Sequence, residues 1–202
     1  MYSRKAFTLT EILIAVVLMG LVILAVASVD ITSRRFFDTS SKESWIQDEA
    51  KIAMEHIIKN TQLGVGDMSN PETADGTNPP TANNSRGFYI LDDEGDLAQS
   101  GSRIQVKQDT DDDGTYDRII DYEYQGAPDY KLVYDPDVGT AGDEETLAEG
   151  IVESVIFSFD SDTPNQVKVT ITVLSDPSKS KSLENPGTTL TSSIVLRAMS
   201  CK

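Results

Sequence analysis

A short acidic segment, Asp109–Asp117, carries side chains suited to binding a hard cation. Counted as a loop, it has carboxylates at positions one, three, five and nine and a glycine at position six: Asp109, Asp111, Asp113, Asp117 and Gly114. Calcium prefers such oxygen ligands, and glycine permits the sharp turn that wraps them around the ion. Position twelve is Ile120 rather than a bidentate acid, and strands are expected on both sides, so this is no EF-hand. The segment predicts a calcium-binding turn, with a plain polar hairpin turn as the alternative.

Two other acidic segments, Asp92–Asp96 and Asp143–Glu145, are expected to be plain turns. The chain offers few groups for other chemistry. It has one histidine, His56, which lies in a stretch with helical periodicity, and a Ser-His-Asp triad around it is not expected. The single cysteine, Cys201, forms no intramolecular disulfide or CxxC metal pair. We therefore predict a protein that is not an enzyme.

The N-terminus combines a small basic cluster, one carboxylate and a long apolar run. Arg4 and Lys5 precede Glu11, and the 18 residues Ile12–Val29 contain no charge. At 1.5 Å per residue, a helix over this run is about 27 Å long, close to the hydrocarbon thickness of a bilayer. Because the positive flank comes first, the leader is expected to stay cytoplasmic and the rest to be exported.

An ordinary secretory signal has a similar beginning, with cleavage after the apolar run at small residues such as Ala25, Ala27 and Ser28. Glu11 does not fit that alternative well. A carboxylate at the mouth of an apolar segment is costly unless a partner meets it. The position of Glu11 therefore needs a specific explanation.

The segment Lys5–Glu11, Lys-Ala-Phe-Thr-Leu-Thr-Glu, resembles the processing site of type IV prepilins and type II secretion pseudopilins. The resemblance implies that a prepilin peptidase cleaves between Ala6 and Phe7, methylates the new amine of Phe7 and leaves the apolar helix in place. The residue before the cut is usually glycine in that family, and here it is Ala6.

In this family the carboxylate at the position of Glu11 pairs with the N-terminus of a neighbouring subunit, which the resemblance implies here. In a filament core of low dielectric such a pair is attractive, and either charge alone is strongly penalised. Pairing would therefore set the register of an entering subunit. The alternative is a carboxylate at the membrane interface with no special role.

The charge and composition of residues 30–202 limit the kinds of partner that this part of the chain can bind. The formal net charge of the 202 residues is −16, and residues 1–29 contribute +1, so the remainder carries −17. Binding to nucleic acid needs clustered Lys and Arg and is not expected. A hydrophobic content of 39% supports one folded domain of ordinary size.

Helical periodicity continues beyond the apolar run in Ile46, Ala50, Ala53, Met54, Ile57 and Ile58, so one helix is expected from Phe7 to about Gln62. Its second half should lay an apolar stripe on a sheet. Phe36, Phe37 and Trp45 are expected to extend that stripe, with contact to neighbouring subunits as the alternative. Residues 64–86 are expected to form a loop. Strands are expected at 87–91, 103–108, 118–124, 131–134, 152–160, 166–174 and 192–199.

The predicted fold class is α+β, a long N-terminal helix on an antiparallel sheet. The predicted organisation is a leader at 1–6, a transmembrane and assembly half of the helix at 7–29, an amphipathic half at 30–62 and a β-rich domain at 63–202.

The order of elements over about residues 100–200 is similar to J-type minor pseudopilins of type II secretion and W-type minor pilins of type IV pili. Membership implies a subunit that initiates or caps a filament. Its partners would be other minor pseudopilins or pilins, the prepilin peptidase and the assembly platform of the inner membrane. The chain would first lie in the inner membrane as a single-pass protein with a periplasmic domain, and then at the filament tip. A filament-borne adhesin and a membrane-tethered enzyme are alternatives of other classes.

Overall fold

The computed structural model describes residues 8–64, 87–111, 117–159 and 166–196. The chain divides into two compact units, Met1–Ser41 and Lys42–Lys202. The first contains only helix among its described residues, and the second contains the end of that helix and all described strands. The predicted α+β architecture, a long N-terminal helix followed by antiparallel sheets, is confirmed.

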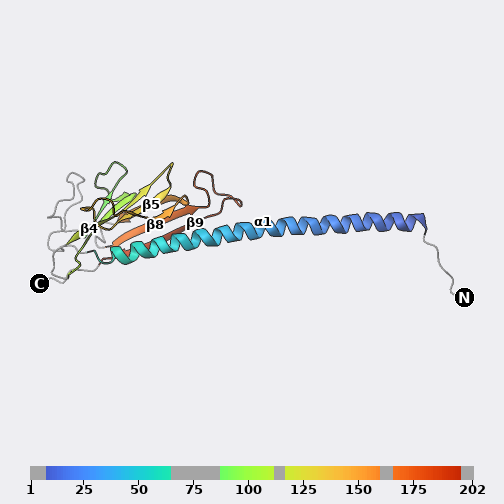
Figure 1. The fold of residues 1–202 in the computed structure, drawn as a ribbon, viewed down its shortest axis with the longest axis horizontal. Helices are drawn as coiled ribbons and strands as arrows, with labels where there is room; N and C mark the ends of the chain where they lie inside the picture. The colour runs from blue at the N-terminus through green and yellow to red at the C-terminus, as the bar shows by residue number, and fades with distance from the viewer. Residues whose placement is uncertain (1–7, 65–86, 112–116, 160–165, 197–202) are drawn as a thin grey trace. The chain divides into compact units, whose positions relative to one another are not determined.

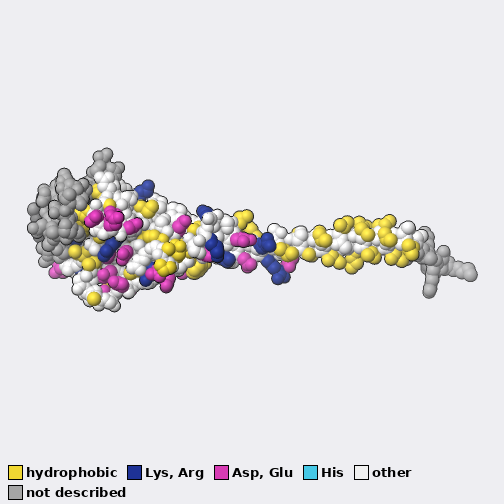
Figure 2. Space-filling model, turned by 90° about the horizontal axis from the view of Figure 1, so that it is seen from above, with side chains coloured by type: hydrophobic (Ala, Val, Ile, Leu, Met, Phe, Trp, Pro, Cys, Tyr) yellow, Lys and Arg dark blue, Asp and Glu magenta, His cyan; other side chains and the backbone are white. Residues whose placement is uncertain are grey.

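Helix α1, Leu9–Thr61, is continuous over 53 residues. It begins two residues later and ends one residue earlier than expected. Every residue from Leu9 to Thr32 is exposed. Figure 2 shows hydrophobic side chains on the visible face of this part of the helix. An α-helix that is apolar on all sides needs an apolar surrounding, such as a bilayer or other helices.

The C-terminal part of α1 buries one face against the strands of its own unit. Its buried apolar residues are Ile46, Ala50, Ala53, Met54 and Ile57, whose spacing is that of a single helical face. The expectation that Phe36, Phe37 and Trp45 extend this stripe is wrong, because their exposed fractions are 69%, 68% and 51%. Burial on the helix begins only at Ile46, immediately after Trp45.

Two antiparallel sheets follow the helix, rather than the one sheet expected. The larger has the order β1-β3-β4-β5-β6 and the smaller the order β2-β7-β8-β9. Figure 1 shows strands of both sheets beside the C-terminal end of α1. The strands of the larger sheet are β1 Phe88–Leu91, β3 Arg103–Gln108, β4 Arg118–Gln125, β5 Lys131–Asp135 and β6 Glu145–Glu149. Those of the smaller sheet are β2 Ser100–Gly101, β7 Val152–Phe159, β8 Gln166–Leu174 and β9 Gly187–Val195.

Three strands depart from the sequence predictions. The short β2 was not expected, and Glu145, which was assigned to a plain turn, is the first residue of β6 and pairs with Tyr134 of β5. Strand β9 begins at Gly187 rather than Ser192 and ends at Val195, because all nine of its residues pair with β8. In each case pairing with a neighbouring strand outweighs weak local propensity.

Candidate functional site

The start of α1 is a capping box formed by Thr8 and Glu11. The carboxylate of Glu11 accepts hydrogen bonds from the backbone N–H and the hydroxyl of Thr8, both at 2.8 Å. The hydroxyl of Thr8 lies 3.3 Å from the backbone nitrogen of Glu11, which donates to it. The two side chains thus satisfy backbone donors that the first helical turn leaves without partners. Thr8 was not among the predicted site residues, although the pattern Thr-x-x-Glu before an apolar run is a known signature of this motif.

The capping box fixes the position of the one carboxylate at the start of the apolar helix. Ala6 and Phe7, the predicted cleavage and methylation residues, lie outside the described residues. Glu11 is exposed, so its second carboxylate oxygen, Oε1, remains open to a group from outside the chain. The geometry gives Glu11 a local structural role that can coexist with the predicted pairing to a neighbouring subunit.

Beyond Glu11 the helix presents only apolar surface for several turns. Among the described residues, α1 is the one helix whose length and composition suffice to cross a membrane. The large apolar residues of this stretch, from Ile12 to Val29, are each more than half exposed within the chain. Such a surface is stable in a bilayer or among other apolar helices, but not in water.

Residues 1–27 match the family described as Prokaryotic N-terminal methylation motif. The match covers the basic cluster, Glu11 and most of the apolar run, and helix α1 begins within it, at Leu9. The chain carries the N-terminal motif of type IV pilin-like proteins. Comparison with curated proteins and with solved structures gives no match.

The acidic loop of this pilin-like protein lies between β3 and β4. Oxygen atoms from Asp109, Asp111 and Asp117 lie within 4.8 Å of one another, so three of the four predicted calcium ligands come together. Asp113, the fourth, lies outside the described residues. The backbone N–H and hydroxyl of Thr110 donate to Asp117 at 2.7 and 2.6 Å and lower its pKa, which keeps this carboxylate ionised. Three clustered carboxylates fit the oxygen preference of Ca²⁺.

Calcium binding by this loop remains a prediction, and a melting experiment tests it. Millimolar CaCl₂ should raise the melting temperature of the full chain in detergent, since a ligand at 100 times its Kd stabilises the fold by about 2.7 kcal/mol. Asp109→Asn with Asp117→Asn should remove the effect, and MgCl₂ should give a smaller one. Asp92→Asn lies in the second acidic cluster, whose carboxylates are grouped in the same way, and it should leave the effect in place if the ion binds between β3 and β4. Equal melting temperatures with and without calcium would leave only a polar hairpin turn.

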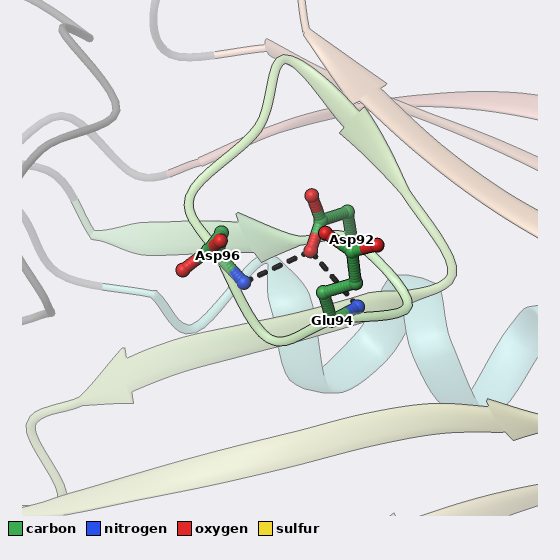
Figure 3. A group of neighbouring side chains, drawn as sticks. All are labelled: Asp92, Glu94 and Asp96. Atoms are coloured by element: carbon green, nitrogen blue, oxygen red, sulfur yellow. Dashed lines mark hydrogen bonds between the residues drawn. The ribbon is translucent and has the colours of Figure 1, made fainter.

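The second acidic cluster forms a turn, and carboxylate oxygens of Asp92, Glu94 and Asp96 also lie within 4.8 Å of one another. Oδ1 of Asp92 accepts hydrogen bonds from the backbone N–H groups of Glu94 and Asp96 at 3.0 and 2.9 Å (Figure 3). Gly95 closes the turn with a φ of 85°, a conformation that glycine adopts without strain. A pocket of about 360 Å³ adjoins this turn and is lined by acidic side chains, Arg103 and one aromatic ring, that of Tyr124. Arg103 forms an ion pair with the buried Asp121.

His56 takes part in a small polar network beneath the larger sheet. Its Nδ1 lies 3.0 Å from the hydroxyl of Tyr122, to which Asn60 Nδ2 donates at 3.1 Å. The rings of Tyr122 and Tyr134 contact it edge-on, with centroid distances of 5.9 and 4.7 Å. Among the described residues, His56 belongs to neither group of clustered carboxylates that could hold a metal ion.

We expect His56 to make the stability of the domain depend on pH. Burial lowers its pKa, and the charge of Lys59 lowers it further while that of Glu145 opposes the shift. Below about pH 6.5 the unfolded chain therefore binds more protons, so the free energy of unfolding should fall as pH falls and stay flat above that value. The difference in unfolding free energy between the wild type and His56→Gln, measured by denaturant titration from pH 5.5 to 8, isolates this contribution. A difference independent of pH would contradict it.

Proposed function

We propose that this pilin-like protein is a minor subunit that initiates or caps an extracytoplasmic filament, as J-type pseudopilins do in type II secretion. The observation that carries the proposal is the carboxylate of Glu11, held by Thr8 at the entrance of an apolar helix and exposed. A charge at this place is useful when a complementary charge meets it during assembly. The order of strands over about residues 100–200 resembles that of J-type pseudopilins and of W-type minor pilins alike.

The mechanism is one of assembly, not catalysis. The apolar part of α1 first lies in the inner membrane, with the domain from Lys42 onward in the periplasm. On assembly this helix leaves the bilayer and packs against the helices of other subunits, so its exposed apolar surface stays away from water throughout. Cleavage before Phe7 supplies the ammonium group that a neighbouring Glu11 meets. The partners would be other minor pseudopilins, the prepilin peptidase and the inner-membrane assembly platform.

Two related functions are the alternatives. A W-type minor pilin would perform the same steps in type IV pilus biogenesis. A filament-tip adhesin would use the domain to bind a ligand, and the acid-lined pocket beside Tyr124 is the feature that favours it. Sugar sites usually present aromatic surface, and this pocket offers a single ring, so the adhesin is the weaker candidate.

Crosslinking in the native envelope followed by mass spectrometry tests the proposal. The chain should carry an N-methylated Phe7 as its first residue and should be joined to pseudopilins of the secretion machine. The same terminus joined to pilus subunits would assign it to the pilus instead. An intact leader, or cleavage near Ser28 with no filament subunit attached, would overturn the proposal.

A further inference from the structure

We propose that strand β9 is a docking edge that receives an extended strand from a different subunit of the same filament. The inference rests on the proposed function, because it takes the partner from the filament. The four edge strands of the two sheets, β1, β6, β2 and β9, differ in length, charge and regularity.

Three of these edges are short or charged, which are common protections against unwanted pairing. Strand β1 has four residues and β2 has two. Strand β6 has five residues, carries Glu145 and Glu149, and shows a register shift against β5. Strand β9 has none of these protections, since its nine residues contain no charge and no proline and pair with β8 without a shift. An edge this long and regular is a template for another strand.

The register shows which backbone groups of β9 point away from β8. The N–H of Ser175 donates to the carbonyl of Pro186 at 2.9 Å, and these two residues continue the β8–β9 register by one step. Antiparallel pairs alternate between hydrogen-bonded and non-hydrogen-bonded ones. Thr188, Leu190, Ser192 and Ile194 therefore face β8, and the outward groups belong to Gly187, Thr189, Thr191, Ser193 and Val195. In the part of the chain that the structure describes, no hydrogen bond from another segment reaches these outward groups.

Strands β8 and β9 contain no carboxylate in a protein of net charge −16. On the exposed face of the sheet, two rows lie opposite each other: Thr172, Thr170 and Lys168 on β8, and Thr189, Thr191 and Ser193 on β9. Two threonine pairs bridge these rows, with hydroxyl oxygens 3.2 and 3.3 Å apart. A protein chain can approach here without bringing carboxylates together.

The side chains on the two faces of β9 determine which residues a partner strand should carry. A strand added at this edge would place every second side chain beside Thr189 and Thr191, and the others beside Leu190 and Ile194 of the inner face. The occupant should therefore be an extended segment that alternates small polar and apolar residues, without a high negative charge. A second copy of this chain is disfavoured, because pairing two subunits would bring together two strongly acidic chains.

Photo-crosslinking in cells tests the inference with the full chain expressed from its own locus. A photoreactive amino acid is placed in turn at Thr189, Thr191 and Ser193, and the crosslinked peptides are sequenced by mass spectrometry. Successive positions should join residues that step by two along one segment of a different chain bearing the N-terminal methylation motif. The same probe at Glu149 of the charged β6 edge is the control and should give no such ladder. Crosslinks that are absent, scattered or made to a second copy overturn the inference.

A proline at the edge supplies the second arm. Thr191→Pro removes an outward donor and puts the ring in the path of the incoming strand, but leaves the β8–β9 bonds intact because the Thr191 N–H is not part of them. It should lower incorporation into filaments by about tenfold or more, a change that the loss of one or two hydrogen bonds and a steric block can produce. Thr191→Val keeps the N–H and should incorporate normally. A melting temperature of Thr191→Pro close to that of Thr191→Val shows that the fold is retained.

The N-terminal peptide of the same samples separates this inference from the proposed function. If Phe7 is methylated and the chain is in filaments while Thr191→Pro incorporates normally, the docking edge is wrong and the filament role stands. If the leader is intact and no filament subunit is crosslinked, the filament role fails and the inference fails with it.

Discussion

Glu11→Gln is expected to reduce incorporation of the protein into filaments by about 100-fold, with N-terminal processing unchanged. The expected loss corresponds to about 3 kcal/mol, the order of cost for leaving one member of a buried ion pair alone. The measurement is the ratio of filament-associated to membrane-associated protein in sheared cell fractions, together with the mass of the N-terminal peptide. Wild-type chain expressed at the same level provides the reference ratio.

The glutamine variant separates two roles of Glu11 that alanine would confuse. Glutamine also fits the third position of a capping box, so the hydrogen bonds from Thr8 survive while the charge is lost. If Glu11 serves only as a cap, Glu11→Gln should behave like the wild type. If its charge meets the ammonium group of a neighbour, Glu11→Gln and Glu11→Ala should fail to a similar degree.

Thr8→Ala is the complementary variant, since it removes the cap and keeps the charge. Loss of a threonine cap costs about 1 kcal/mol, so a moderate effect on incorporation is expected, smaller than that of Glu11→Gln. Glu43→Gln, an exposed carboxylate elsewhere on α1, should have no effect. A ranking in which Thr8→Ala is more harmful than Glu11→Gln would show that the cap, and not the charge, is what assembly needs.

The N-terminal part of the protein was predictable from the sequence because its signals are local. The uninterrupted apolar run and the single carboxylate at Glu11 specify a helix, a membrane-compatible surface and the methylation family without any information from distant residues. The strand β8 was equally clear, because it alternates polar and apolar residues over its whole length. The prediction for Asp109, Asp111 and Asp117 likewise depended only on spacing within one loop, and the structure brings these residues together.

The features that the sequence did not reveal depend on pairing between distant segments. The residues of β6, Glu-Thr-Leu-Ala-Glu, have low β propensity and become a strand through their pairing with β5. The first five residues of β9 resemble a loop and become a strand because β8 extends beside them. Phe36, Phe37 and Trp45 show the reverse, because aromatic residues are often buried while these three are exposed, and the buried residues of α1 begin at Ile46.

Ile57→Ala is expected to lower the free energy of unfolding of the domain by about 3 kcal/mol, within the range for removing a fully buried isoleucine side chain. Ile57 is 0% exposed and lies on the helical face that meets the core. The cost has two sources, the lost burial of the side chain and the cavity that its neighbours do not fill. The measurement is urea unfolding of the full chain in detergent, followed by the tyrosine and tryptophan signals.

Ile52→Ala is the matched control for this prediction. Ile52 is the same residue type on the same helix, five positions earlier and therefore about 140° around the helix axis, and its exposed fraction is 61%. Alanine has a higher helix propensity than isoleucine, so this variant should unfold within about 0.5 kcal/mol of the wild type. Equal effects of the two substitutions would contradict the packing of α1 described here. A large effect of Ile57→Ala alone would establish that one face of this helix holds the domain together.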